Sequence, residues 1–475
     1  MLREIVIKEL RDTFSSTRFM IIFSACTVLI LLSVFTGLQN YQSNLKYYQA
    51  AQSVMRDTIE RQVSYEALGL WGEYKVYKRP PLLSGLVEGL EGDLGRNTVI
   101  HRYYAPRLND TKFNEQPIYA VFGSLDVAFV VKVVLSLLAL VFTYDAICGE
   151  RERGTLKQIM ANAIPRDTLI LGKLLGSFLS LVLPLAMPLL LGLLMFAVYP
   201  GIALSGEDWL RALVLLGLFL IYTTIFLMLG IFISTRTARS SLSFLVSLIV
   251  WVLFVLVIPR VSVMLAAQAV PVPSGAEVEA RKQALGRQWY REFFAELERW
   301  RQQHPEGPSP PTDEQVPQSV TEEINRRLEE RFNLERRRLD EAYMMSQRRQ
   351  LALATWVSRL SPMAVFSQAA MRLAHTGIDY QERFLQAAQE YQRQFADYIE
   401  AKMREERRQR AQGQSFRWGG GGEKLDISDM PQFSFRPEPL GPSLRQMGVD
   451  IGVLVFYALL CFLGAYVSFL RYDVR

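Results

Sequence analysis

Apolar runs of about 20 residues alternate along this chain with strongly polar stretches. A helical run of about 20 apolar residues is long enough to cross the hydrocarbon core of a bilayer. The pattern therefore predicts an all-α membrane protein with six transmembrane helices. These helices are expected at Phe19–Leu38, Leu125–Ile147, Leu169–Tyr199, Trp209–Ile233, Leu242–Ile258 and Val449–Leu470. Pro184 and Pro188 lie within the third run and are expected to kink it.

Two polar stretches, residues 40–124 and 259–448, are long enough to form structures of their own. In the first we expect a helix over Tyr41–Leu68, followed by turns and short extended pieces in a run rich in Gly and Pro. In the second, apolar residues recur every three or four positions among many Arg and Glu residues, which is typical of a helical hairpin or coiled coil. Helices are expected there at Ala276–Gln303, Ser319–Leu360 and Asp379–Gln412.

Basic residues mark the short segments of one side of the membrane. They are Arg3, Lys8, Arg11 and Arg18 in a predicted interfacial helix over residues 1–18, Arg151, Arg153, Lys157 and Arg166 between the second and third spans, Arg236 and Arg239 between the fourth and fifth, and Arg471 and Arg475 in the tail. The short loop on the other side carries Glu207 and Asp208 and no basic residue. Because short cytoplasmic loops are enriched in Lys and Arg, both termini are predicted to be cytoplasmic, with residues 40–124 and 259–448 outside.

Composition changes this prediction little. The net charge of +6 agrees with a basic cytoplasmic edge and gives no reason to expect nucleic-acid binding. The three cysteines, Cys26, Cys148 and Cys461, all lie outside the long polar stretches, so no disulfide is expected in those stretches. The three histidines are widely separated, and we expect no metal site.

No motif of an ATPase or a hydrolase is present. Gly172-Lys173 lacks the preceding glycine and the following hydroxyl of a phosphate-binding loop, and there is no G-x-S-x-G. We therefore expect a protein that is not an enzyme and holds no cofactor itself. If it uses ATP, then ATP and Mg²⁺ must be bound by a partner.

The most informative stretch is GERERGTLKQIMANAIPRDTLILGK, residues 149–173. Charges this dense cannot lie in hydrocarbon, so the segment must lie in water between two spans. Its Glu-Arg-Glu-Arg-Gly-Thr run, short amphipathic helix, Arg166 and Gly172-Lys173 resemble the coupling-helix region of type-two ABC transporter permeases. The run YKRPPLLSGLVEGLEGDLGRNTVI, residues 77–100, is similar to the segment after the first span of permeases of the nitrous-oxide-reductase-maturation group.

This resemblance implies the membrane subunit of a prokaryotic ABC exporter in the cytoplasmic (inner) membrane, with a large extracytoplasmic insertion. A separate ABC ATPase and a second permease chain would be its partners. The coupling helix would lie within residues 148–168. By the same resemblance, eight residues would serve the ATPase contact, with Gly154 allowing a close turn: Glu150, Arg151, Glu152, Arg153, Gly154, Thr155, Leu156 and Arg166.

Other interpretations stay open on the sequence alone. The charged stretch could be a solvated loop, and the long outer helices could act on an extracytoplasmic envelope protein, as a mechanical or assembly scaffold that transports nothing. Asp126 and Lys132 in the second span are a candidate intramembrane polar site, although a local ion pair or a side chain reaching to the membrane edge explains them more simply. Because the spans are otherwise Leu, Val, Ile and Phe, a lipidic or amphipathic cargo suits them better than a hydrated one.

Overall fold

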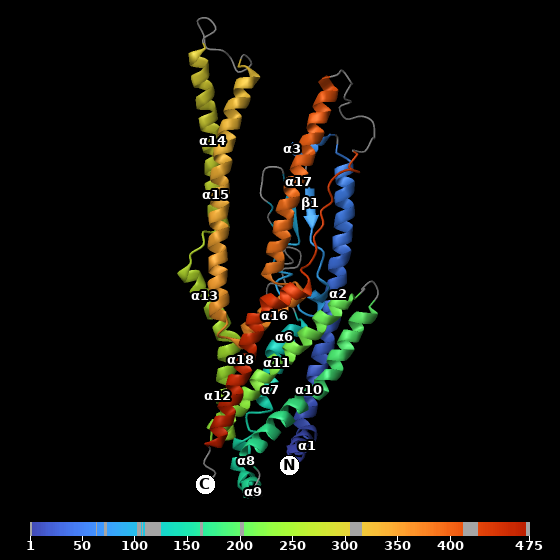
Figure 1. The fold of residues 1–475 in the computed structure, drawn as a ribbon, viewed down its shortest axis with the longest axis vertical. Helices are drawn as coiled ribbons and strands as arrows, with labels where there is room; N and C mark the ends of the chain where they lie inside the picture. The colour runs from blue at the N-terminus through green and yellow to red at the C-terminus, as the bar shows by residue number, and fades with distance from the viewer. Residues whose placement is uncertain are drawn as a thin grey trace. The chain divides into compact units, whose positions relative to one another are not determined.

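The computed structural model of the chain describes residues 2–62, 64–70, 74–101, 106, 108–109, 125–161, 165–199, 204–304, 316–411 and 426–471. The chain forms two compact units, one made of residues 1–256 and 361–475 and the other of residues 257–360. Residues 259–448, predicted to form one outer domain, are therefore divided between the two units. Figure 1 shows the course of the chain.

Within the described residues, five helical runs are long and apolar enough to cross a membrane. They are α2 (Thr17–Glu60), α10 (Arg166–Val198), α11 (Gly206–Arg236), α18 (Leu440–Leu470), and the run Ser240–Ala269, in which α12 (Ser240–Val252) continues through the π-helix η3 (Leu253–Val257) into α13 (Ile258–Ala269). Each contains one of the predicted spans, except that α10 ends at Val198, one residue before the predicted boundary at Tyr199. Pro184 and Pro188 lie inside α10 as expected.

The predicted second span is shorter than the other five. It consists of α6 (Val127–Phe129), the π-helix η2 (Val130–Leu135) and α7 (Ser136–Val141), after which turns occupy residues 142–147. Just after this helix, the Thr143 hydroxyl donates to the carbonyl of Ala139 at 2.7 Å. The helix ends at Val141, six residues before the predicted boundary at Ile147, and the run Val127–Val141 is therefore shorter than the five long helices.

The first polar stretch, residues 40–124, differs from the prediction in its helix and agrees with it in its strands. α2 continues without interruption from the first span to Glu60, and the short helix α3 (Tyr65–Leu70) follows. The extended pieces form an antiparallel sheet of β1 (Tyr74–Tyr77), β2 (Asn97–Ile100) and β3 (Leu108–Asn109), in that order. In register, Tyr74 pairs with Ile100 and Thr98 with Leu108. Between β1 and β2 lies the 3-10 helix η1 (Leu82–Gly85).

Helix α17 (Ile378–Ala411) matches the predicted Asp379–Gln412 and covers the sheet. Its Phe384, Tyr391 and Phe395 form an apolar cluster with residues of β1 and β2, and the rings of Tyr74 and Phe395 stack at 5.6 Å. Burial of these aromatic faces is the main force that holds helix and sheet together.

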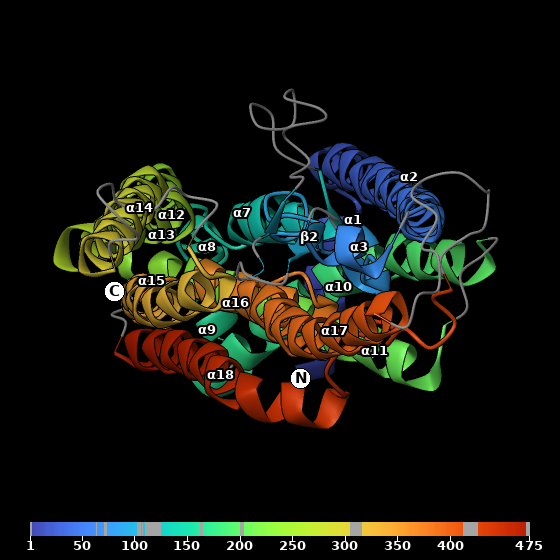
Figure 2. The same cartoon turned by 90° about the horizontal axis from the view of Figure 1, so that it is seen from above.

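Helix α16 (Pro362–Ala374) was not foreseen as part of the membrane core. It packs against α11 and α18 (Figure 2), and its Phe366 stacks on Tyr222 of α11 with the ring centroids 4.4 Å apart. The Tyr222 hydroxyl in turn donates to the carbonyl of Lys132 at 2.8 Å. Arg372 of α16 pairs with Asp450 at 3.2 Å, so that the buried carboxylate of α18 is neutralised from a neighbouring helix.

The second unit contains a helical hairpin, one of the two arrangements predicted for this stretch. α14 (Gly275–Gln303) and α15 (Gln318–Ser358) run antiparallel, since Lys282 pairs with Asp340, and Glu292 with Arg331. Their apolar seam contains Leu297 and Leu328 among its buried residues. Long helices of this composition depend on such a seam, because propensity alone stabilises isolated helices only weakly.

Candidate coupling site

Two short helices, α8 (Cys148–Glu152) and α9 (Thr155–Ala161), follow the short apolar helix that ends at Val141 and lie at the same end of the first unit as the N-terminus (Figure 1). Gly154 separates them with φ +75°, a left-handed conformation that glycine adopts without strain. A side chain at this position would meet nothing within 4 Å, so Gly154 serves the turn and not a close approach within this chain. Arg151, Glu152 and Arg153 are exposed, whereas Glu150 is buried.

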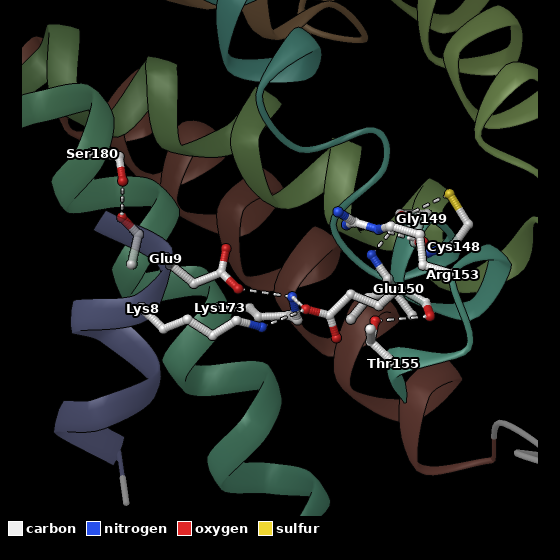
Figure 3. A network of polar contacts seen from close by, with 12 residues as sticks. Lys8, Glu9, Cys148, Gly149, Glu150, Arg153, Thr155, Lys173 and Ser180 are labelled. Carbon is white, nitrogen blue, oxygen red and sulfur yellow. Dashed lines mark hydrogen bonds and ion pairs between the residues drawn. The ribbon is translucent and has the colours of Figure 1, made fainter. Parts of the chain in front are cut away.

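Glu150 is the centre of a network of ion pairs (Figure 3). Its Oε1 atom accepts hydrogen bonds from Lys173 Nζ of α10 at 2.9 Å and from Lys8 Nζ of α1 (Leu2–Phe14) at 3.2 Å. Lys173 also donates to Glu9 Oε1 at 2.9 Å. The side chains of Lys173 and Glu150 are 2% and 6% exposed, and that of Lys8 is 50% exposed. The network therefore joins three elements through one buried lysine.

Two glycines of α10 bring α1 close enough for these contacts. A Cβ atom on Gly172 would lie 2.6 Å from Ile5 Cγ2, and one on Gly176 would lie 2.6 Å from Glu9 Cβ. Because residues four apart lie on one face of a helix, Gly172 and Gly176 form a shallow seat for α1. Lys173 follows Gly172 directly in α10, so the close approach of α1 brings Glu9 within hydrogen-bonding distance of the Lys173 ammonium.

Further hydrogen bonds tie the same segment to α11 and α12. Glu152 accepts from the backbone N–H and the hydroxyl of Ser240 at 3.1 and 2.5 Å, and so binds the first residue of α12. Ser234 of α11 accepts from the backbone N–H groups of Ile147 and Cys148 at 3.0 and 3.1 Å. A displacement of α8 would therefore pull on α1, α10, α11 and α12 together.

The electrostatic balance of the cluster favours the charged form of Glu150. Burial raises the pKa of its carboxyl, but the charges and hydrogen bonds of Lys173 and Lys8 outweigh burial, and the pKa lies below its ordinary value of 4.5. The second carboxylate oxygen, Oε2, is buried with no hydrogen-bond partner among the described residues. All the stabilisation of this charge thus comes through Oε1 and its two lysines.

Acidification should remove the contribution of Glu150 to stability. Above pH 4.5 the carboxyl is charged in the folded and unfolded states, and its ion pairs stabilise the folded state in full. As the pH falls through 4.5 and then through the lower folded-state pKa, the unfolded state takes up the proton first and this stabilisation is lost. Thermal unfolding of wild type and Glu150→Gln should therefore differ most near neutral pH. A difference that stays constant down to about pH 3 would contradict this.

Comparison with known families identifies the kind of protein that carries this network. A family model described as ABC-2 family transporter protein matches residues 3–474. The chain belongs to the ABC-2 transporter family. A search of curated proteins found no match. An ABC-2 permease is the membrane component of an ABC transporter, and membership in this family implies an ABC ATPase as its partner.

The structure distributes the other predicted coupling residues of this permease over several contacts. The Thr155 hydroxyl donates to the carbonyl of Glu150 at 3.2 Å, and Leu156 is buried in the same core as the spans. Arg166 donates to the carbonyl of Leu470 at 2.6 Å and so joins the start of α10 to the end of α18. An ATPase contact of all eight residues stays a prediction, but Glu150 lies inside the permease and is not presented at its surface.

Asp126 and Lys132 have different surroundings. Asp126 caps α6 by accepting from the backbone N–H of Phe129 at 2.6 Å, and it also accepts from the N–H of Glu88 at 2.9 Å. The Lys132 ammonium lies 5.8 Å from the centroid of the Phe129 ring. Through these two hydrogen bonds, Asp126 connects the segment after η1 to the start of α6.

Sequence reasoning missed Lys8, Glu9 and Lys173 as members of one cluster. A signal was present, because Lys173 lies inside an otherwise apolar run, and an ionisable residue there needs a partner. The identity of that partner depends on contacts across 164 and 23 residues of sequence, which no local pattern reveals. In the described part of the chain, no group of His, Cys, Asp or Glu is placed to hold a metal ion.

Proposed function

We propose that this chain is the permease subunit of a prokaryotic ABC exporter and that α8 and α9 receive the stroke of a separate ATPase. The observation that supports this is the attachment of one short segment to α1, α10, α11 and α12 through Glu150, Glu152 and Ser234. A solvated loop would need no such attachments. In this proposal the exposed charges of α8 and α9 contact the ATPase. The buried Glu150 transmits the displacement of α8 to α1 and α10 through its ion pairs with Lys8 and Lys173.

The remaining parts of the proposal follow from the family and the charge pattern. Two permease chains would act with ATPase subunits that bind ATP and Mg²⁺, in the cytoplasmic (inner) membrane. Both termini would be cytoplasmic, and the α14–α15 hairpin would be part of an extracytoplasmic insertion like that of the nitrous-oxide-reductase-maturation group. The apolar spans suit a lipidic or amphipathic cargo.

Reversal of the exposed charges on this segment should weaken the ATPase contact. Arg151 and Lys157 are exposed on α8 and α9. Removing charge pairs from a partly desolvated interface costs about 2–5 kcal/mol when one partner is left behind. Arg151→Glu with Lys157→Glu should therefore reduce co-purification of the ATPase and permease-dependent ATP turnover, without loss of the folded permease. Arg337→Glu, at an exposed position of α15, is the control. Equal ATPase binding by all three proteins would exclude this docking surface.

The proposed orientation has a direct test. In a variant without Cys26, Cys148 and Cys461, a single cysteine at Glu329 of α15 should react with an impermeant maleimide in intact spheroplasts. A single cysteine at Lys157 should react only after lysis. Both native positions are exposed, so accessibility to water does not distinguish them. The reverse pattern of labelling would overturn the orientation, and with it the cytoplasmic location of α8 and α9.

A second function, mechanical action on an envelope partner, is favoured by the size of the hairpin. α15 has 41 residues and is therefore about 60 Å long. In this alternative the ATPase is coupled in the same way, but the stroke moves the hairpin and no cargo crosses. ATP-dependent flux of a labelled amphipathic lipid in vesicles that contain permease and ATPase supports export. A stable envelope partner together with no such flux supports the scaffold.

A further inference from the structure

A cavity of about 500 Å³ lies between α2, α10, α11 and the segment from η1 to α6. Apart from the indole N–H of Trp209, the described side chains that line it are apolar. α10 contributes Leu189, Leu190 and Leu193, α11 contributes residues from Gly206 to Phe219, and the other elements contribute one residue each. The volume falls within the range of about 300–1,000 Å³ that is usual for ligand pockets. These side chains offer an occupant no charge, and the indole N–H of Trp209 is the one hydrogen-bond donor among them.

The cavity lies in the half of the spans that is remote from the coupling site. Leu193 is in the last two turns of α10, which begins near the coupling site at Arg166, and Trp209 is in the first turn of α11. Tryptophan is enriched where a membrane helix meets the headgroup layer. The cavity therefore extends from the membrane–water boundary on the side away from the coupling site into the adjacent leaflet.

Close packing behind the cavity holds its wall in place. A Cβ on Gly192 would lie 2.8 Å from Val34 Cγ2, and one on Gly85 would lie 2.5 Å from the Phe196 ring. α2, α10 and η1 are thus in contact behind the cavity and cannot collapse further into it. On its rim, Leu190 and Leu213 are exposed, and in a bilayer they face lipid.

An empty cavity of this size would lose dispersion contacts along its whole lining. Water is a poor occupant because a buried water needs roughly two to four polar partners, and of these side chains that of Trp209 alone carries a polar group. We propose that the cavity binds one acyl chain of a phospholipid from the leaflet remote from the coupling site, with the headgroup in the polar layer beside Trp209. This proposal needs only the membrane placement of the spans, so it stands or falls independently of the ATPase.

Photochemical labelling tests the proposal with the full-length chain. The protein is reconstituted in vesicles of phosphatidylethanolamine and phosphatidylglycerol that contain a trace of phosphatidylcholine with a diazirine at the end of one acyl chain. After irradiation, adducts are mapped by mass spectrometry. We expect them to concentrate on residues 189–193 of α10 and 206–219 of α11. Adducts spread evenly over all lipid-facing positions of the five long helices would overturn the proposal, since they would indicate boundary lipid alone.

A matched pair of variants strengthens the test. Leu193→Trp fills the cavity and should reduce adducts on α11 about tenfold, which corresponds to about 1.4 kcal/mol of lost affinity. Leu194→Trp makes the same substitution at the next position, which is exposed and outside the cavity lining, and should leave these adducts unchanged. Equal labelling of the two variants would contradict an acyl-chain site. Ala212→Phe, on the opposite wall, replaces Leu193→Trp if that variant does not fold. No ATP or ATPase is present, so a failed coupling model cannot affect the result.

Discussion

Lys173→Met should uncouple the permease from its ATPase and lower its free energy of unfolding by about 3–5 kcal/mol. Lys173 is the buried cation between Glu9 and Glu150, and methionine would leave both carboxylates without it. Glu150 would keep only the half-exposed Lys8, and its second oxygen already lacks a partner among the described residues. The exposed charges of α8 and α9 are untouched, so the ATPase should still co-purify while permease-dependent ATP turnover is lost. Turnover and thermal unfolding are the measurements.

A double variant separates the lost ion pair from a general defect. Glu150→Gln together with Lys173→Met removes one of the two orphaned charges and should recover part of the stability lost by Lys173→Met alone. Residues in contact give such non-additive effects, whereas independent sites add. Glu150→Gln alone should cost less than Lys173→Met, because Lys173 keeps Glu9. Wild-type turnover and stability in Lys173→Met would show that the network does not carry coupling.

Gly37→Ala should be nearly as damaging, although it adds a single methyl group. A Cβ at Gly37 of α2 would lie 1.8 Å from the carbonyl oxygen of Gly85, which is backbone and cannot rotate away. α2 and η1 must separate, and overpacking of this kind costs about 1–3 kcal/mol, occasionally more. The variant should unfold at lower temperature than wild type.

Gly217→Ala is the matched control. Gly217 lies inside α11, and a Cβ there would meet nothing within 4 Å. Replacing a helical glycine by alanine in open space is favourable by about 0.5–1 kcal/mol, so this variant should be at least as stable as wild type. If both alanines have the same effect, the close contact of Gly37 with Gly85 does not stabilise the fold.

The long helices could be predicted from sequence because length and periodicity are local properties. The prediction of Ala276–Gln303 agrees with α14 at Gly275–Gln303 to within one residue. α16 could not be predicted in the same way. At 13 residues it is too short to register as a span, and its burial depends on contacts such as that between Phe366 and Tyr222, on helices far apart in the chain.

The charges of α8 and α9 are evident in the sequence, but the different contacts that each charge makes could not be predicted from it. Glu150 and Glu152 look equivalent in the run Glu-Arg-Glu-Arg. Only the tertiary contacts place Glu150 under α1 and α10 and leave Glu152 at the first residue of α12. Besides Lys173 itself, the four-residue spacing of Gly172 and Gly176 is a second local indication that another helix approaches α10 there.

The pair of Arg372 and Asp450 has a consequence for biogenesis. Asp450 enters the membrane as part of the last span, and its partner is synthesised 78 residues earlier. A carboxylate inside a span is costly until it is neutralised. The last span therefore reaches its final depth at lower cost when α16 is already in place beside α11 and provides Arg372. Insertion of the C-terminal helix is then linked to the correct placement of the preceding segment, because the ion pair forms only when both helices are in position.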